Sequence, residues 1–160
     1  MPRMKNYEDF RISFPIPENW RITEDESSNL IFDDPRDKSY WCSIEFGGLK
    51  AKTPDKPVPS AKFVLASCFE KELASKTSVL LELQDGRAMV EWPESAEHQG
   101  QQYLVHHLQV AAPVISGDVQ LANFCLTIPL PVQDQAKVDD LKILVRQQAV
   151  SAQFKEWRKS

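Results

Sequence analysis

Apolar and polar residues alternate in several short runs of the first third of the chain, a pattern that predicts half-buried strands. The run 9–14 brings its apolar residues to one face: Phe10, Ile12 and Phe14. A short apolar run at 29–32 and an alternating run at 40–46 predict two more strands. The prolines after residue 14 and the paired glycines after residue 46 are expected to end the first and third strands.

Two hairpins are predicted in the second half of the chain. Their strands are expected at four runs with apolar residues on alternate positions: 77–84, 87–92, 102–111 and 119–128. Asp85-Gly86, between the first two runs, is a dipeptide typical of two-residue hairpin turns. The polar stretch 93–101 is expected to be a loop between the hairpins.

Helical periodicity occurs in two segments, 61–76 and 135 to about 154. Ser60 and Asp134 stand where each helix begins and can cap its first backbone amides. The first apolar stripe is expected to contain Ala61, Leu65, Cys68, Phe69 and Leu73. The second is expected to contain Val138, Leu141, Val145, Ala149 and Ala152. The proline-rich stretch 51–60 is expected to be an extended connection.

Short turns between strands favour antiparallel pairing, and each amphipathic helix needs a surface on which to bury its stripe. The sequence therefore predicts an α+β fold, with a mostly antiparallel sheet of about six to seven strands and helices packed on its faces, in the order βββ-α-ββββ-α. The chain has 160 residues, of which 42% are hydrophobic. This size predicts a single domain over residues 1–160.

Acidic residues outnumber basic ones, 23 against 19, which gives a net charge of −4. The excess is concentrated between Glu82 and Asp134, where seven acidic residues accompany one base, Arg87. Binding to nucleic acid and to anionic lipid depends on positive charge. We therefore expect neither as a partner.

Three cysteines lie far apart among apolar neighbours: Cys42, Cys68 and Cys125. An odd number at such spacing favours buried, reduced thiols over a disulfide framework or a zinc site. The N-terminal residues lack the apolar core of a secretory signal, and no run approaches the roughly eighteen apolar residues of a membrane span. A cytoplasmic protein is the expectation.

Several features resemble the PsbP/Mog-like superfamily over nearly the full length. They are the order of elements, the Pro-x-x-Trp turn from Pro17 to Trp20, the hairpin that contains Trp92, and the closing strand, proline and helix. Members of that superfamily are mostly non-catalytic binding, assembly or chaperone modules, and some bacterial members resemble adaptors for secreted effectors. The resemblance implies this broad class, and it transfers no site residue because no binding motif matches position by position.

His106-His107 is the pair of residues with the most obvious chemistry. Adjacent residues of a strand point to opposite faces, so the two imidazoles do not readily bind one ion. His106 shares a face with Leu104 and Leu108 and is expected at the edge of the core. His107 is expected to face solvent or a helix. No metal site is predicted.

A cysteine nucleophile needs a histidine base, and Cys125 is expected on a strand beside the one that carries His107. Its neighbours Phe124 and Leu126 are apolar and no glycine-rich oxyanion loop follows it, which favours a packing role. This pair leaves one alternative function open, a small-ligand carrier or an enzyme with a pocket near His107 and Cys125.

Paired carboxylates at Asp33-Asp34 and Asp139-Asp140 have structural explanations. The first pair precedes a proline in a turn, and the second lies near the positive end of a predicted helix. Glycine-rich phosphate-binding motifs and a G-x-S-x-G turn are absent from the sequence. No catalytic residue and no cofactor are therefore predicted.

Two tryptophans and three glutamates are the candidates for a partner-binding surface: Trp41, Glu91, Trp92, Glu94 and Glu97. Aromatic side chains rimmed by polar groups are typical of protein interfaces. The alternative is that helices cover both sheet faces and bury both rings. The sequence predicts a non-enzymatic protein-binding, adaptor or chaperone-like module whose unknown protein partner is basic or is a secreted effector.

Overall fold

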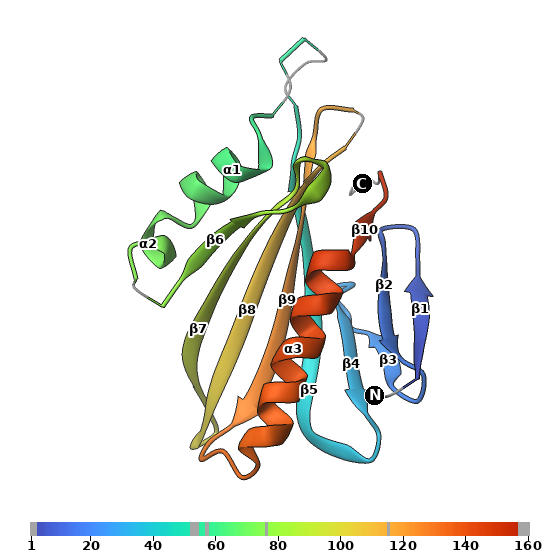
Figure 1. The fold of residues 1–160 in the computed structure, drawn as a ribbon, viewed down its shortest axis with the longest axis vertical. Helices are drawn as coiled ribbons and strands as arrows, with labels where there is room; N and C mark the ends of the chain where they lie inside the picture. The colour runs from blue at the N-terminus through green and yellow to red at the C-terminus, as the bar shows by residue number, and fades with distance from the viewer. Residues whose placement is uncertain (1–2, 52–54, 57, 76, 115, 157–160) are drawn as a thin grey trace.

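The computed structural model describes residues 3–51, 55–56, 58–75, 77–114 and 116–156. Seven strands form one antiparallel sheet, shown in Figure 1. From edge to edge they are β3 (Arg21–Glu24), β4 (Leu30–Asp34), β5 (Asp37–Leu49), β9 (Val119–Pro129), β8 (Gln101–Pro113), β7 (Ala88–His98) and β6 (Val79–Glu82). The predicted fold class, a largely antiparallel sheet with helices on its faces, is confirmed.

A second, three-stranded sheet has the order β1-β2-β10, with β1 at Met4–Glu8, β2 at Ile12–Pro17 and β10 at Gln153–Phe154. The helix α3 (Gln135–Ser151) lies across the large sheet, with the hairpin of β1 and β2 beside it (Figure 1). We call the sheet face that α3 covers the α3 face, and the opposite one the far face. The short helices α1 (Ala61–Cys68) and α2 (Glu70–Leu73) follow β5 in the chain.

The two faces of the sheet support two separate hydrophobic clusters, because successive residues of a strand point to opposite sides. On the α3 face, Phe14 of β2 packs against Phe32 and Phe124 of the sheet, with ring centroids 5.6 and 5.9 Å apart. On the far face, Leu65 of α1 packs with Val90 and other buried residues. α1 therefore covers the part of the far face formed by β6, β7 and β8.

Both predicted helix caps are confirmed. The Ser60 Oγ accepts a hydrogen bond from the backbone N–H of Phe63, and the Asp134 side chain accepts one from Lys137. These contacts satisfy amides that have no partner within the helix. The stripe of α3 is buried as predicted, but the first helix is divided at Phe69 and Cys68 is exposed, so its expected burial is wrong.

The predicted end of the third strand is wrong, since β5 continues through Gly47 and Gly48 to Leu49. A Cβ on Gly48 would lie 3.1 Å from the carbonyl oxygen of Val119 on β9. Glycine is needed there for the close approach of the two strands, which the sequence pattern indicates only as a break.

The opening of the chain differs from the predicted strand at 9–14. Phe10 lies in the turn between β1 and β2 and is 66% exposed, whereas Arg11 is 3% exposed. Pro15 and Pro17 lie inside β2, where β10 pairs only with the first two residues of that strand. A proline is tolerated where a strand has a partner on one side only.

Three further differences concern β3, the stretch 93–101 and β6. β3 was not predicted, because its residues are mostly polar and exposed. The stretch 93–101 is not a loop but the end of β7, a tight turn and the start of β8. The alternating apolar residues of the run 77–84 include Val79 and Leu81, but on β6 these are 48% and 40% exposed. Leu80, which lies between them, packs against the hydrophobic cluster beneath α1.

The connection expected at 51–60 lies partly outside the described residues.

Among the helices in the described part of the chain, none is long and apolar enough to cross a membrane.

Candidate functional site

One row of side chains crosses five strands on the far face. The strand register aligns the row from β4 to β7 as Ile31, Ser43, Cys125, His107 and Trp92. Aligned residues of neighbouring antiparallel strands lie about 5 Å apart, so their side chains touch. The prediction that Cys125 lies on a strand beside that of His107 is confirmed, and the two residues are direct partners.

His107 is held by contacts on both ring nitrogens and on one ring face. Its Nδ1 lies 3.3 Å from the Cys125 Sγ and 3.2 Å from the Asn123 Nδ2. Because the amide and the thiol are both donors, Nδ1 accepts, and the ring proton is on Nε2, which faces the Glu94 Oε1 at 3.5 Å. The imidazole also stacks on Trp92, with ring centroids 4.7 Å apart.

This arrangement differs from a catalytic cysteine site. In a catalytic triad, the nucleophile contacts one nitrogen of the histidine base, and the residue that orients the histidine contacts the other nitrogen. Here Cys125 and Asn123 share Nδ1. Burial raises the pKa of the Cys125 thiol to about 12, so the sulfur is a neutral thiol at physiological pH. The cluster is suited to packing and hydrogen bonding.

Beyond the part covered by α1, the far face keeps partly exposed side chains, and we call this region the open half. It is defined by residues of β5, β7, β8 and β9: Trp41, Ser43, Glu45, Glu94, Tyr103, Val105, His107, Asn123, Cys125 and Thr127. Trp41 packs edge-on against Tyr103, with centroids 5.5 Å apart. Two aromatic pairs, Trp41–Tyr103 and Trp92–His107, thus lie on either side of smaller residues.

The five predicted partner-binding residues do not lie on one surface. Trp41, Trp92 and Glu94 lie on the far face. Glu91 lies on the α3 face, where it accepts hydrogen bonds from His106 at 2.8 Å and from Arg146 of α3. Glu97 of β7 accepts a hydrogen bond from Gln102 of β8, next to the turn that joins these two strands. The single rim of three glutamates expected from the sequence is therefore not formed.

The Glu91 interactions are electrostatically strong. The side chain of Glu91 is 13% exposed, and the hydrogen bond from His106, together with that from Arg146, lowers the pKa of its carboxyl to about 2 although burial opposes the shift. His106 is 9% exposed, which confirms its predicted place at the core edge. These three residues join α3 to the sheet.

The charge on the central strands is of one sign. β7, β8 and β9 contain no lysine or arginine, whereas β7 contains three glutamates. Within the described residues there is also no group of three or more His, Cys, Asp or Glu side chains arranged to hold a metal ion. The carboxylates on the open half itself are Glu94 of β7 and Glu45 of β5, so this surface is suited to positively charged groups of a partner.

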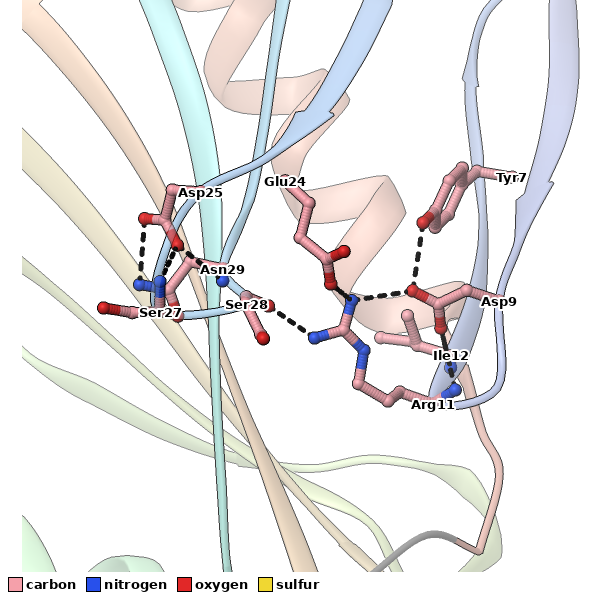
Figure 2. Close-up of polar contacts among 9 residues, drawn as sticks. All are labelled: Tyr7, Asp9, Arg11, Ile12, Glu24, Asp25, Ser27, Ser28 and Asn29. Atoms are coloured by element: carbon pink, nitrogen blue, oxygen red, sulfur yellow. Dashed lines mark hydrogen bonds and ion pairs between the residues drawn. The ribbon is translucent and has the colours of Figure 1, made fainter. Parts of the chain in front are cut away.

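A second polar cluster surrounds Arg11 at the turn between β1 and β2 (Figure 2). Its guanidinium pairs with Asp9 at 2.9 Å and with Glu24 at 3.0 Å, and donates to the Ser28 carbonyl. The Phe46 ring lies 4.1 Å from the guanidinium carbon. This cluster ties the β1 and β2 hairpin to the turn between β3 and β4, which is a structural role.

A surface cavity of about 700 Å³ lies beside the short 3-10 turn at Gln84–Gly86 and the C-terminal end of α3. Arg87 in its wall donates to the carbonyls of Val150 and Ala152 and so caps that helix. Neither His107 nor Cys125 lines this cavity.

Sequence reasoning identified the tryptophans but not Glu45, Tyr103 or Asn123. The signal for Asn123 was its position between Ala122 and Phe124, which puts it on the polar face of a predicted strand. The neighbours of that face could be assigned only with the strand register, which the hairpin turns determine.

Comparison with known proteins gives a likeness of fold. No family model and no curated protein matches the sequence. Among solved structures, the chain is similar to LpqN of Mycobacterium tuberculosis, described as involved in cell envelope biogenesis, with a TM-score of 0.58, 14% identity and coverage of 96% of this chain and 91% of LpqN. A protein from Bacteroides thetaiotaomicron matches 91% of this chain with a TM-score of 0.57 and 14% identity. This chain spans 45% of that longer protein.

Proposed function

We propose that the chain is a non-enzymatic protein-binding module, of the adaptor or chaperone-like kind, whose protein partner docks on the open half of the far face. The observation that carries this proposal is the combination of two aromatic pairs with two carboxylates, Glu45 and Glu94, on a face whose strands β7, β8 and β9 contain no lysine or arginine. A few residues supply most of the binding energy of typical interfaces and are enriched in tryptophan and tyrosine, and complementary charge accelerates association.

Two further points support the proposal. The PsbP/Mog-like resemblance implies a superfamily composed mostly of binding and assembly modules. The neutral Cys125 thiol, with Asn123 on the same imidazole nitrogen, lacks the features of a nucleophile. Of the five candidate residues, Trp41, Trp92 and Glu94 are proposed for the interface, because they share the far face.

Site-specific photo-crosslinking in the native host tests this function. A photoreactive residue replaces Thr127 on the open half, and the control replaces Ile143, which is 52% exposed on α3. We expect one abundant protein to be crosslinked from position 127 only. The purified pair should form a stoichiometric complex that the Trp41→Ala substitution weakens by at least about tenfold.

Two results would contradict the proposal. One is that positions 127 and 143 give the same crosslinked products, or that neither position gives any. The other is a purified partner whose affinity is unchanged by Trp41→Ala and by Glu94→Lys.

A second candidate function, a small-ligand carrier or an enzyme that uses His107 and Cys125, is favoured by the 3.3 Å contact between Sγ and Nδ1. Thiol labelling separates the two functions, since a working nucleophile is a reactive thiolate. Cys68 is exposed and should react with iodoacetamide first, while Cys125 and Cys42 should react only after denaturation. Preferential labelling of native Cys125 would favour the second candidate.

A further inference from the structure

A polar row lies next to the row of Cys125 and His107. The register aligns Glu45 of β5, Asn123 of β9 and Gln109 of β8 on three neighbouring strands. All three point to the far face, because they alternate with core residues such as Ile44, Phe124 and Leu108. A carboxylate and two amides thus lie within a span of about 10 Å.

Part of the hydrogen-bonding capacity of this row is not used by the described residues. Gln109 is 7% exposed, and its amide atoms reach the surface without a hydrogen bond to a described residue. The Asn123 Oδ1 is buried without a donor, while the Nδ2 of the same side chain is bound to His107. Buried polar groups in proteins are nearly always paired, so the unpaired Asn123 Oδ1, between Glu45 and Gln109, points to a ligand that pairs it.

The row has the electrostatic character of a cation site. Glu45 is exposed, and its negative charge contributes to raising the pKa of the nearby Cys125 after burial, which is the main cause. Among the described residues Glu45 has no ion-pair partner, and β8 and β9 contain no base that could supply one. The neighbouring Ser43 and Cys125 have small side chains.

We propose that this row binds an arginine side chain of the partner. A guanidinium is planar, has five N–H donors and can reach acceptors on adjacent strands together, whereas an ammonium is a compact, strongly hydrated charge. The Glu45 carboxylate neutralises the guanidinium, and the side-chain oxygens of Gln109 and Asn123 accept its remaining donors. This inference rests on the proposed function, and it specifies the chemistry of the partner at the border between the open half and the part of the far face that α1 covers.

Titration with a small probe tests the arginine site without the partner. Isotope-labelled protein is titrated with N-acetyl-arginine methylamide, and the side-chain NH₂ signals of Asn123 and Gln109 are followed by NMR. We expect saturable shifts of both signals with an affinity in the millimolar range. The neutral isostere N-acetyl-citrulline methylamide should bind at least about tenfold more weakly, because it lacks the charge that Glu45 pairs.

Two variants give the control. Glu45→Gln keeps the shape of the row and should weaken the arginine probe by about tenfold or more. Glu26→Gln, an exposed carboxylate in the turn after β3, should leave its affinity unchanged. The inference would be overturned if the arginine and citrulline probes bound equally well. It would also be overturned if the arginine probe gave no saturable shift, or shifted signals of other residues but not those of Asn123 and Gln109. If crosslinking from position 127 succeeds while the arginine probe fails, the arginine site alone is rejected and the docking face stands.

Discussion

The indole of Trp92 lies nearly parallel to the imidazole of His107, with an interplanar angle of 10° and ring centroids 4.7 Å apart. Phe69, at the end of α1, packs on the same indole at 5.1 Å. Trp92 therefore joins a helix to two strands and also borders the open half. Its role in binding has to be separated from its role in the fold.

Comparing two tryptophan variants separates these roles. Trp92→Ala removes contacts with Phe69 and His107 and should lower the free energy of unfolding by roughly 2–3 kcal/mol. Trp41→Ala loses chiefly its edge-on contact with Tyr103 and should cost about 1 kcal/mol. Urea denaturation measures both values. Equal losses would mean that Trp41 is as structural as Trp92.

Charge reversal at Glu91 and at Glu94 should have different effects on stability, although the two residues are only three positions apart. Glu91→Lys places a cation beside His106 and Arg146 and should lower the free energy of unfolding by about 3 kcal/mol or more. The Glu94 side chain is 57% exposed, so Glu94→Lys should leave the melting temperature nearly unchanged. Differential scanning calorimetry measures both effects.

The same pair predicts a difference in association. Glu94→Lys should slow binding of a basic partner in stopped-flow measurements at low salt, and the difference should shrink once the screening length falls below about 8 Å. An association rate that is unaltered at low salt would remove Glu94 from the proposed interface.

The low pKa of Glu91 predicts acid sensitivity. Its carboxyl titrates at about 2 in the folded protein, below the ordinary value of 4.5, because of the hydrogen bonds from His106 and Arg146. A lowered folded pKa stabilises the protein above the ordinary value, and this contribution is lost as the pH falls from about 4.5 to about 2. The stability difference between wild type and Glu91→Gln, measured by urea denaturation, should therefore decline as the pH falls from about 4.5 to about 2. A difference that does not change with pH would contradict the assigned pairing.

Arg11 should be among the residues most sensitive to substitution. Arg11→Met leaves Asp9 and Glu24 without their cation and should cost about 3–5 kcal/mol, the usual loss when one partner of a buried ion pair is removed. The matched control is Arg21→Met, because Arg21 is 55% exposed and pairs with Asp33 at 3.5 Å. That change should cost at most about 1 kcal/mol. Similar losses in both variants would show that burial of Arg11 is unimportant.

The sequence predicted the elements in which one face is fully apolar. β8, β9 and α3 have buried residues at the expected spacing, so their apolar stripes were recognisable. β3 and the end of β7 were missed because a strand of polar residues has no such stripe. The alternation in the run 9–14 places Arg11 on the polar face of a strand, and its burial depends on ion pairs with Asp9 and Glu24, of which only the fold brings Glu24 near.

The candidate site was predictable only in part. Trp92, His107 and Cys125 were each singled out, and the adjacency of their strands followed from the hairpins. Their alignment in one row depends on the strand register, which changes whenever a hairpin turn changes length. Because the polar stretch 93–101 predicts a loop, the hairpin of β7 and β8 is expected to be shorter than it is. The position of Glu94 on a strand therefore could not be predicted.

The brevity of β6 has a consequence for self-association. Its pairing with β7 stops at Glu91, so the rest of β7 is an edge with unpaired backbone groups. Such edges recruit strands from other molecules unless the sequence prevents it. Here Pro93 has no N–H to offer, and Glu94 and Glu97 add like charges that repel a second copy. The rim of the open half is thereby protected against aggregation by strand addition, and a partner is directed to the side chains of the face rather than to the backbone of its edge.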